Sequence, residues 1–151
     1  MSVAIVSDST GYLTPELIPP GVTVVPVAVV VGGQAFDEGV EISVDEVADA
    51  LRRRTAVSTS RPAPARFALA YAELADQGHA AIVSVHLSGE LSGTFDAARA
   101  AAREAAVPVI AVDSRTVGTA LGFAVRSAAE MAARGAAAEE VASAARRRAD
   151  A

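Results

Sequence analysis

The sequence predicts an α/β fold, with a mostly parallel sheet that carries helices on both faces. Short, continuous apolar runs are typical of strands buried on both faces, and they occupy residues 3–6, 79–85 and 109–112. Segments with apolar residues at helical spacing alternate with these runs, which favours a parallel sheet. Each run also ends in a polar turn, and such turns are where α/β proteins place binding groups.

The first strand, residues 3–6, runs directly into a polar turn that contains Asp8, Ser9 and Thr10. In a parallel sheet this turn lies at the carboxyl edge, where ligands bind. Asp8 or Thr10 equally suits the cap of a short turn at residues 15–18, and local chemistry leaves both roles open.

A β-rich run follows at residues 22–31, interrupted by Pro26. Because proline cannot donate a hydrogen bond to a ladder, the run predicts an edge strand or a bulged strand. The glycine pair at 32–33 predicts a hairpin turn, with a return strand over residues 35–37.

Ser43 and Glu46 form a capping-box pattern and predict the start of a helix. The apolar residues that follow at helical spacing are Val44, Val47, Ala48 and Leu51. Three arginines at 52–54 lie in the last turn, where cations complement the helix dipole.

Residues 57–64 predict a loop whose hydroxyls and prolines give it a defined backbone geometry. Pro64 suits the first turn of the next helix. That helix carries Phe67, Tyr71 and Leu74 on one face and ends at Gly78.

The central stretch is residues 84–94, between the apolar run at 79–85 and a helix expected over 95–106. It contains two glycines and three hydroxyl side chains, which are Gly89, Gly93, Ser88, Ser92 and Thr94. Hydroxyls and helix N–H groups, with no cation beside them, suit a small anionic head such as a carboxylate or a phosphate. Helix capping by Ser92 and Thr94 is the alternative role.

In the last third, the run at 109–112 ends in a polar turn that begins at Asp113, and a helix follows up to Gly135. Its expected inner face is Val117, Leu121, Ala124, Val125, Ala128 and Met131. Gly118 and Gly122 share a face and allow close packing against the sheet or a ligand tail. A final helix over about 137–149 has a thin apolar face with little to hold it in place.

The polar turns after the three apolar runs share one edge of the predicted sheet, and we expect the loop that contains Thr59 to join them. Each hydroxyl alone could be a helix cap. Four such loops at one edge favour a binding site.

The composition predicts one domain over residues 1–151, because 151 residues suffice for a single core. A net charge of −5 argues against a nucleic-acid partner. The chain has no Cys, which fits a cytoplasmic protein, and its apolar runs are too short for an integral membrane segment.

The sequence favours binding over catalysis. The nucleophile-elbow pattern, a P-loop lysine and paired metal-ligand histidines are missing from it, so we expect no enzyme, no metal and no cofactor. The open alternative is His86, which could act with Asp8 or Asp113 as a base or phosphoryl carrier, or be a satisfied structural histidine.

These motifs together resemble the DegV family of bacterial fatty-acid-binding proteins. The matching pieces, in the order of the family, are Asp8-Ser9-Thr10, Val24-Val25-Pro26, Asp37-Glu38-Gly39-Val40, Thr59-Ser60-Arg61-Pro62, Ser88 to Thr94, and Val112-Asp113-Ser114 with Gly118 and Gly122. One departure is Arg61, which stands where glutamine is common in the family.

The resemblance implies a carrier that holds one long-chain fatty acid and presents it to a separate fatty acid kinase for phospholipid synthesis. It implies that Thr59 and Ser92 hydrogen-bond the carboxylate, with Ser60, Ser88 and Gly93 beside them. Residues expected to support this shell are Asp8, Ser9, His86, Asp113 and Gly118.

The resemblance also implies a second domain, because the family places its fatty acid where two domains meet. Residues 1–151 would be the N-terminal domain, and the final helix, about 137–149, would lead into the missing one. We expect the uncovered surface to be apolar and to promote homo-association. A truncated interaction module without a ligand is the third alternative.

Overall fold

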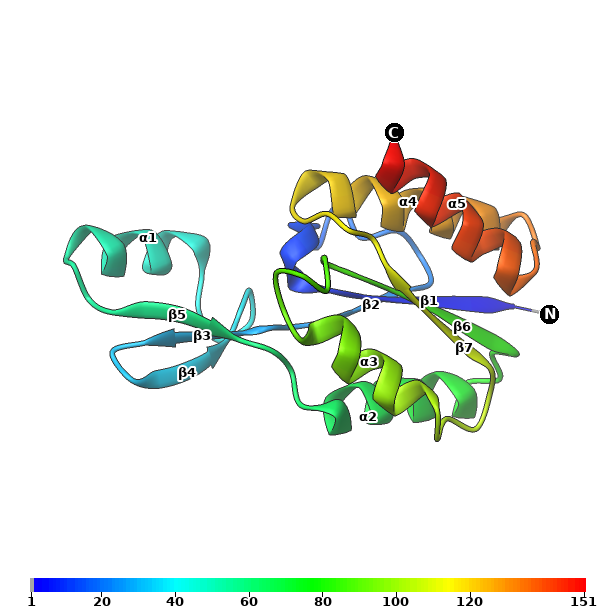
Figure 1. Cartoon of the computed structure of the whole chain (residues 1–151), viewed down its shortest axis with the longest axis horizontal. Helices are drawn as coiled ribbons and strands as arrows, with labels where there is room; N and C mark the ends of the chain where they lie inside the picture. Colours follow the sequence, from blue (N-terminus) through cyan, green and yellow to red (C-terminus); the bar gives the residue numbers. More distant parts are fainter. Residues whose placement is uncertain (1) are drawn as a thin grey trace.

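The computed structural model describes residues 2–151 and contains a four-stranded parallel sheet in the order β2-β1-β6-β7 (Figure 1). Its strands are β1 (Val3–Asp8), β2 (Val22–Val25), β6 (Ala81–His86) and β7 (Val109–Asp113). Helices α2 (Pro64–Asp76) and α3 (Thr94–Ala102) cover one face, and α4 (Thr119–Ala133) and α5 (Ala138–Asp150) cover the other. The predicted fold class is confirmed.

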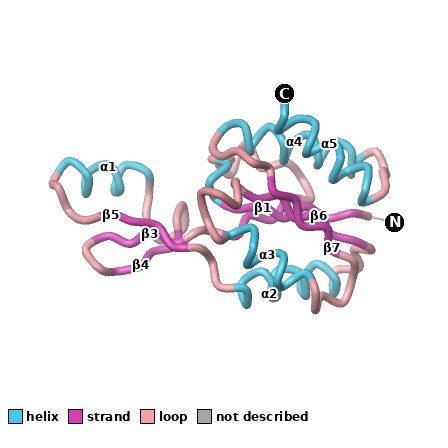
Figure 2. The backbone as a smooth tube through the Cα atoms, in the orientation of Figure 1, coloured by secondary structure: helices cyan, strands magenta, loops and turns pink. Residues whose placement is uncertain are grey.

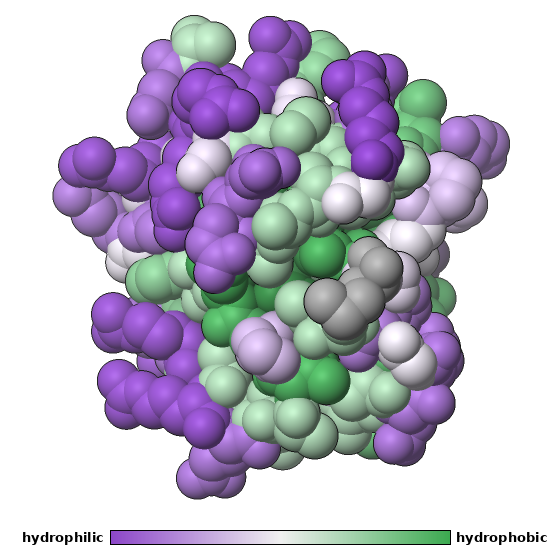
Figure 3. All heavy atoms as spheres, turned by 90° about the vertical axis from the view of Figure 1, so that its right-hand side faces the viewer, coloured by the Kyte–Doolittle hydropathy of each residue, from purple (hydrophilic) through white to green (hydrophobic). Residues whose placement is uncertain are grey.

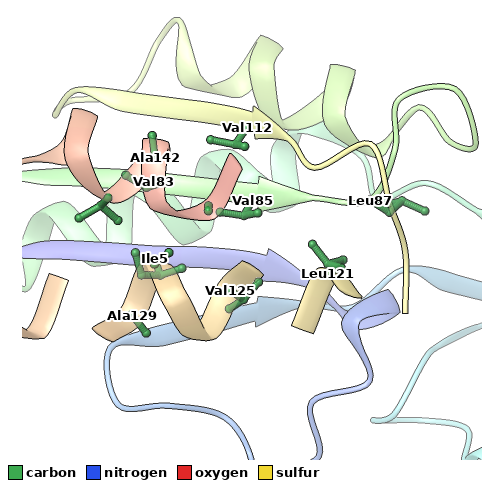
Figure 4. Close-up of a cluster of buried hydrophobic side chains, with 12 residues drawn as sticks. Ile5, Val83, Val85, Leu87, Val112, Leu121, Val125, Ala129 and Ala142 are labelled. Atoms are coloured by element: carbon green, nitrogen blue, oxygen red, sulfur yellow. The ribbon is translucent and has the colours of Figure 1, made fainter. Parts of the chain in front are cut away.

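Alternate residues of the central strands enter two separate cores. Ile5, Val83 and Val85 pack against α4 and α5 (Figure 4), whereas Ala4, Val6 and Ile82 pack against α2 and α3. Because both faces are covered, these strands are apolar at nearly every position, which is why they appear in the sequence as continuous runs.

The strand order identifies one edge of this sheet as the place for a ligand. Numbered within the sheet, the order is 2-1-3-4, so the chain winds in opposite directions on the two sides of β1. In such doubly wound sheets the crevice lies at the carboxyl ends of the strands where the order reverses. Here that point is between β1 and β6.

A smaller antiparallel sheet, in the order β4-β3-β5, extends from the body on the side of the carboxyl edge (Figure 2). Its strands are β3 (Ala28–Val31), β4 (Gln34–Asp37) and β5 (Val57–Ser60), and helix α1 (Val44–Arg52) lies over one face of it. We call these four elements the small lobe.

One strand prediction in this region is correct only in part, and one loop prediction is wrong. The run at 22–31 is not one strand, because Pro26 lies where the chain leaves β2, an edge strand of the parallel sheet, for β3, the middle strand of the lobe. Residues 57–60, predicted as loop, form β5. Their hydroxyl-rich sequence lacks an apolar strand pattern, and pairing with β3 makes them a strand.

Helix α1 begins as predicted, but its predicted apolar face is only partly buried, because Val47 and Ala48 are half-buried and the two outer residues are exposed. Glu46 N–H donates to Ser43 Oγ at 3.1 Å and Ser43 N–H to Glu46 Oε1 at 3.2 Å, which completes the capping box. Val44 is nevertheless 73% exposed and Leu51 58% exposed. The helical spacing of the apolar residues therefore predicted that a helix forms, but it did not predict which of these residues are buried.

The C-terminal helices also differ from prediction. Helix α5 is firmly packed, because Val141, Ala142 and Ala145 are fully buried against α4 and the sheet. Its alanines allow a close approach between helices, so a thin apolar face is enough. Val117 lies before α4 and is exposed, not part of its inner face.

Figure 3 shows the side of the molecule where the parallel strands begin, with hydrophobic residues in the middle and hydrophilic residues around them. Val3, Val107 and Val109 are only partly buried and pack against the two cores. The hydroxyl-rich turns lie at the opposite edge. No helix within residues 2–151 is long and apolar enough to cross a membrane.

Candidate functional site

A buried chain of hydrogen bonds connects the ends of β1 and β6. His86 Nδ1 lies 2.9 Å from Asp8 Oδ2, and His86 Nε2 lies 2.6 Å from Ser84 Oγ. The Tyr71 hydroxyl donates to Ser84 Oγ at 2.7 Å. Parallel pairing of β1 with β6 places Asp8 beside His86, although 78 positions separate them in the sequence.

The Ser84–His86–Asp8 contacts have the order of a catalytic triad, but the access that catalysis needs is missing. Ser84 and His86 are 0% exposed and Asp8 is 2% exposed. A nucleophile must reach its substrate, and this burial leaves Ser84 and His86 without that access. Burial and the two hydrogen bonds of the ring thus favour the structural alternative for His86 over the base or phosphoryl-carrier alternative.

Asp8 fastens the two loops that leave β1 and β6. It accepts hydrogen bonds from Thr10 N–H at 3.0 Å and Leu87 N–H at 3.2 Å, and from the Thr10 hydroxyl. Burial raises the pKa of Asp8, but the hydrogen bond and charge of His86, together with Thr10, outweigh it and hold the pKa below its ordinary value. Asp8 thus caps η1 (Ser9–Gly11), not the turn at 15–18.

In the loop between β6 and α3, the hydroxyls make local hydrogen bonds. Ser92 Oγ accepts from Thr94 N–H at 3.1 Å and lies 2.8 Å from Thr94 Oγ1. Ser88 Oγ accepts from Glu90 N–H at 3.3 Å. Ser92, which is half-buried, thus accepts from the first N–H of α3, but the N-cap of the helix is Gly93, so neither Ser92 nor Thr94 is the predicted N-cap.

The three polar turns at the carboxyl edge are joined to one another, as predicted. The carboxylate of Asp113, the half-buried last residue of β7, accepts from Gly89 N–H at 3.2 Å, and Ser88 N–H donates to Thr116 O at 2.8 Å. Gly118 N–H donates to Thr10 O at 2.9 Å, which ties the β7 turn to the β1 turn.

The two glycines near α4 serve backbone packing. Gly118 is the residue before the helix and has a φ of 69°, a conformation that favours glycine. A Cβ on Gly122 would lie 2.8 Å from Gly11 O, so the helix approaches η1 closely. Of the two expected roles, close packing is therefore confirmed for Gly122.

Ser9 joins the parallel sheet to the small lobe. Its hydroxyl donates to Glu38 Oε2 at 2.8 Å and accepts from Val27 N–H at 3.0 Å. Ser9 thus holds the start of β3 and the end of β4 against the end of β1.

Thr59 and Ser60 lie in β5 and are both exposed. Thr59 pairs with Val29 and Ser60 with Ala28, so the two side chains point to opposite faces of the strand. Ser60 Oγ makes a local contact with Arg61 O at 3.4 Å.

Arg61 brings this segment to the carboxyl edge, and sequence reasoning missed its role. A Cβ on Gly93 would lie 2.5 Å from Arg61 Nη1 and 2.7 Å from Arg61 Cδ, so the arginine side chain lies across the glycine. The positive charge of Arg61 therefore lies beside the loop between β6 and α3, where the sequence predicted no cation. The signal in the sequence is the arginine itself, which directly follows Thr59 and Ser60.

Each of the three turns also presents one large, exposed apolar side chain. Tyr12 follows β1 and is 60% exposed, Leu91 follows β6 and is 66% exposed, and Val117 follows β7 and is 41% exposed. Within residues 2–151, no three His, Asp or Glu side chains gather as a metal site. The edge thus combines hydroxyls, a cation and apolar surface.

Comparison with known sequences assigns the family. The sequence profile described as "uncharacterised protein, DegV family" matches residues 2–151. A DegV domain-containing protein of Streptomyces coelicolor is 51% identical over 148 residues, which are 97% of this chain and 53% of that protein. One from Deinococcus radiodurans is 46% identical over 133 residues, covering 87% of this chain and 47% of that protein.

Solved structures agree with this assignment. A fatty-acid-binding DegV family protein from Thermus thermophilus aligns with a TM-score of 0.85 and 32% identity over 99% of this chain and 54% of that one. DegV from Bacillus subtilis, described as a fatty acid binding protein, aligns with a TM-score of 0.89 and 26% identity over the same shares. The chain spans about half the length of these relatives, and it belongs to the DegV family.

Proposed function

We propose that this chain binds one long-chain fatty acid at the carboxyl edge of its parallel sheet. The observation that carries the proposal is the composition of that edge: three joined turns, each with hydroxyls and one exposed apolar side chain. An amphiphilic ligand needs both kinds of surface. The description of two similar DegV structures as fatty-acid-binding supports the same ligand.

The carboxylate is proposed to accept hydrogen bonds from Thr59 and Ser92, with Ser60, Ser88 and Gly93 beside them. Thr59 is exposed, and its strand leads directly to Arg61, which touches Gly93. The start of α3 adds N–H groups and a partial positive charge. Ser60 is the weakest member of this set, because it points away from Thr59.

The alkyl chain is proposed to lie over the apolar side chains of the same edge, near Tyr12, Leu91 and Val117. Burial of each CH₂ contributes about 0.8 kcal/mol before ordering costs. The tail therefore supplies most of the affinity, and the polar groups orient the carboxylate.

We propose that the chain acts as a carrier and not as an enzyme. In this role it presents the carboxylate to a separate fatty acid kinase in the cytoplasm, for phospholipid synthesis. The burial of His86 and Ser84 supports a non-catalytic role, and the family resemblance supports the kinase. Residues 1–151 would be the N-terminal domain, with α5 leading into a second domain, in line with the greater length of the relatives.

Native mass spectrometry of the protein purified from bacteria, followed by identification of any extracted lipid, tests the proposal. We expect one fatty acid per chain, lost in the double variant Thr59→Val and Ser92→Ala. Thr55→Val is the matched control, because Thr55 is an exposed threonine before β5. An empty protein that also rejects palmitate and oleate would contradict binding by this chain, and the same spectra report whether it self-associates.

A further inference from the structure

We propose that Arg61 is the cationic partner of the ligand carboxylate, and that it makes the site select an ionised acid over its neutral analogue. The inference rests on the proposed function and deepens it. It starts from the position of the side chain, which lies across Gly93 between Ser92 and Thr94 at the start of α3.

The first step is that the backbone brings the Arg61 side chain to this position. Pro62, which follows it, is buried and has a fixed φ, so the chain that leaves β5 is anchored beside the body. The stem of Arg61 then crosses Gly93, where a Cβ would approach Cδ to 2.7 Å and Cζ to 3.3 Å. Only glycine at position 93 leaves room for this arrangement.

The second step is that the charge of Arg61 is not used within the protein. None of the ion pairs formed within residues 2–151 includes Arg61. Asp96, the acidic residue in the first turn of α3, pairs with Arg99 at 2.9 Å. In a chain with a net charge of −5, an unpaired guanidinium beside hydroxyls attracts an anion.

The third step is chemical. A guanidinium presents parallel N–H donors that match the two oxygens of a carboxylate. A site made only of hydroxyls and backbone N–H groups would also bind a neutral head group, such as that of an alcohol. Glutamine at this position would supply a single amide without charge. Arg61 therefore gives this chain a stronger preference for the ionised acid than glutamine would.

Equilibrium binding of radiolabelled palmitate and hexadecanol tests the inference. We expect Arg61→Gln to weaken palmitate binding about tenfold and to leave hexadecanol binding unchanged, because a charged hydrogen bond is lost only with the acid. Arg61→Lys should recover part of the affinity, since the charge returns without the planar donors. Arg103→Gln, at the other end of α3, is the matched control for the change in charge.

A double-mutant cycle tests the part played by Gly93. Gly93→Ala should weaken palmitate binding to a similar degree by displacing Arg61, and the addition of Arg61→Gln should then cost nothing more. Thermal melts confirm that each variant is folded.

The inference, but not the proposed function, would be overturned if wild type and Arg61→Gln bound palmitate equally. It would also be overturned if Arg61→Gln lost equal affinity for palmitate and for hexadecanol. Failure of the wild-type chain to bind palmitate would overturn the proposed function as well.

Discussion

The parallel sheet has a pair of helices on each face, whereas the antiparallel sheet of the small lobe has the single helix α1. In the body, the residues that line both faces of β1 and β6 are almost fully buried. In the small lobe and the turns beside it, the buried apolar residues are few, and they are Val27, Val29, Ile42 and Ala50. The body therefore supplies most of the stability.

The proposed site takes residues from both regions. Ser88, Ser92 and Gly93 come from a loop fixed by Asp8 and Asp113, while Thr59 and Arg61 come from the lobe and its junction. A region with few buried contacts opens at low free energy, and binding loops are commonly drawn from such regions. A ligand bound between the carboxyl edge of the parallel sheet and the loosely packed lobe would reduce the motion of the lobe.

The same substitution in the two regions gives the largest expected contrast. Leu121→Ala removes a leucine that is 0% exposed in the body and should lower the free energy of unfolding by about 2–5 kcal/mol. Leu51→Ala removes a leucine that is 58% exposed in the lobe and should cost about 0.5 kcal/mol. Urea denaturation measures both, and equal losses would contradict the contrast.

The buried polar chain at the edge of the body gives the next largest effect. Asp8→Asn replaces an acceptor of several hydrogen bonds by an amide whose N–H₂ group faces other donors. The unfolding free energy should fall by about 2–4 kcal/mol.

The pH dependence provides the control for Asp8. The folded protein holds the pKa of Asp8 below its ordinary 3.8, so the unfolded chain takes up this proton first as the pH falls. Wild-type stability should therefore decline below about pH 4, and the gap between wild type and Asp8→Asn should narrow there. A gap that widens in acid would show that the carboxylate is not stabilised by folding.

The architecture of the body follows from sequence far better than its internal contacts do. Continuous apolar runs such as residues 79–85 indicate strands covered on both faces, and the polar turns after them mark the binding edge. The contact between Asp8 and His86 depends on which strands are neighbours and on their register, and neither is contained in local periodicity.

The lobe was harder to predict for a physical reason. Strand β5 is hydroxyl-rich, and its strand conformation comes from pairing with β3, not from burial of its own side chains. The contact of Arg61 with Gly93 further depends on how the lobe meets the body. The expected role of Thr59 therefore came from family resemblance, and the cation beside it came from the structure.

Tyr71→Phe removes the buried hydroxyl that bonds Ser84 Oγ at 2.7 Å and, more weakly, Ala98 O at 3.4 Å, and it should cost about 1 kcal/mol at neutral pH. Burial raises the pKa of Tyr71 to about 12. Because the unfolded chain loses this proton near pH 10, wild-type stability should decline between about pH 10 and 12, and the variant should lack this part of the decline. Denaturation midpoints across this range measure the effect, and identical alkaline profiles would contradict it.

At the junction of the two regions we expect a small change in total stability together with a strong local effect. Ser9→Ala removes the hydroxyl that donates to Glu38 and accepts from Val27 N–H, while the core of the body is untouched. Global unfolding should change by about 1 kcal/mol, but the backbone amides of β3 and β4 should exchange with deuterium several-fold faster, since the lobe opens separately.

The partly exposed ion pair between Arg66 and Asp37, at 3.1 Å, also joins the lobe to α2 and provides the control. Arg66→Gln should accelerate exchange in the lobe much less than Ser9→Ala, because exposed ion pairs contribute little to stability. If Ser9→Ala accelerated exchange equally in β1, β6 and the lobe, the two regions would unfold as one unit. A ligand could then not reduce the opening of the lobe separately from that of the body. The fold, and not a ligand, would keep Arg61 beside Gly93.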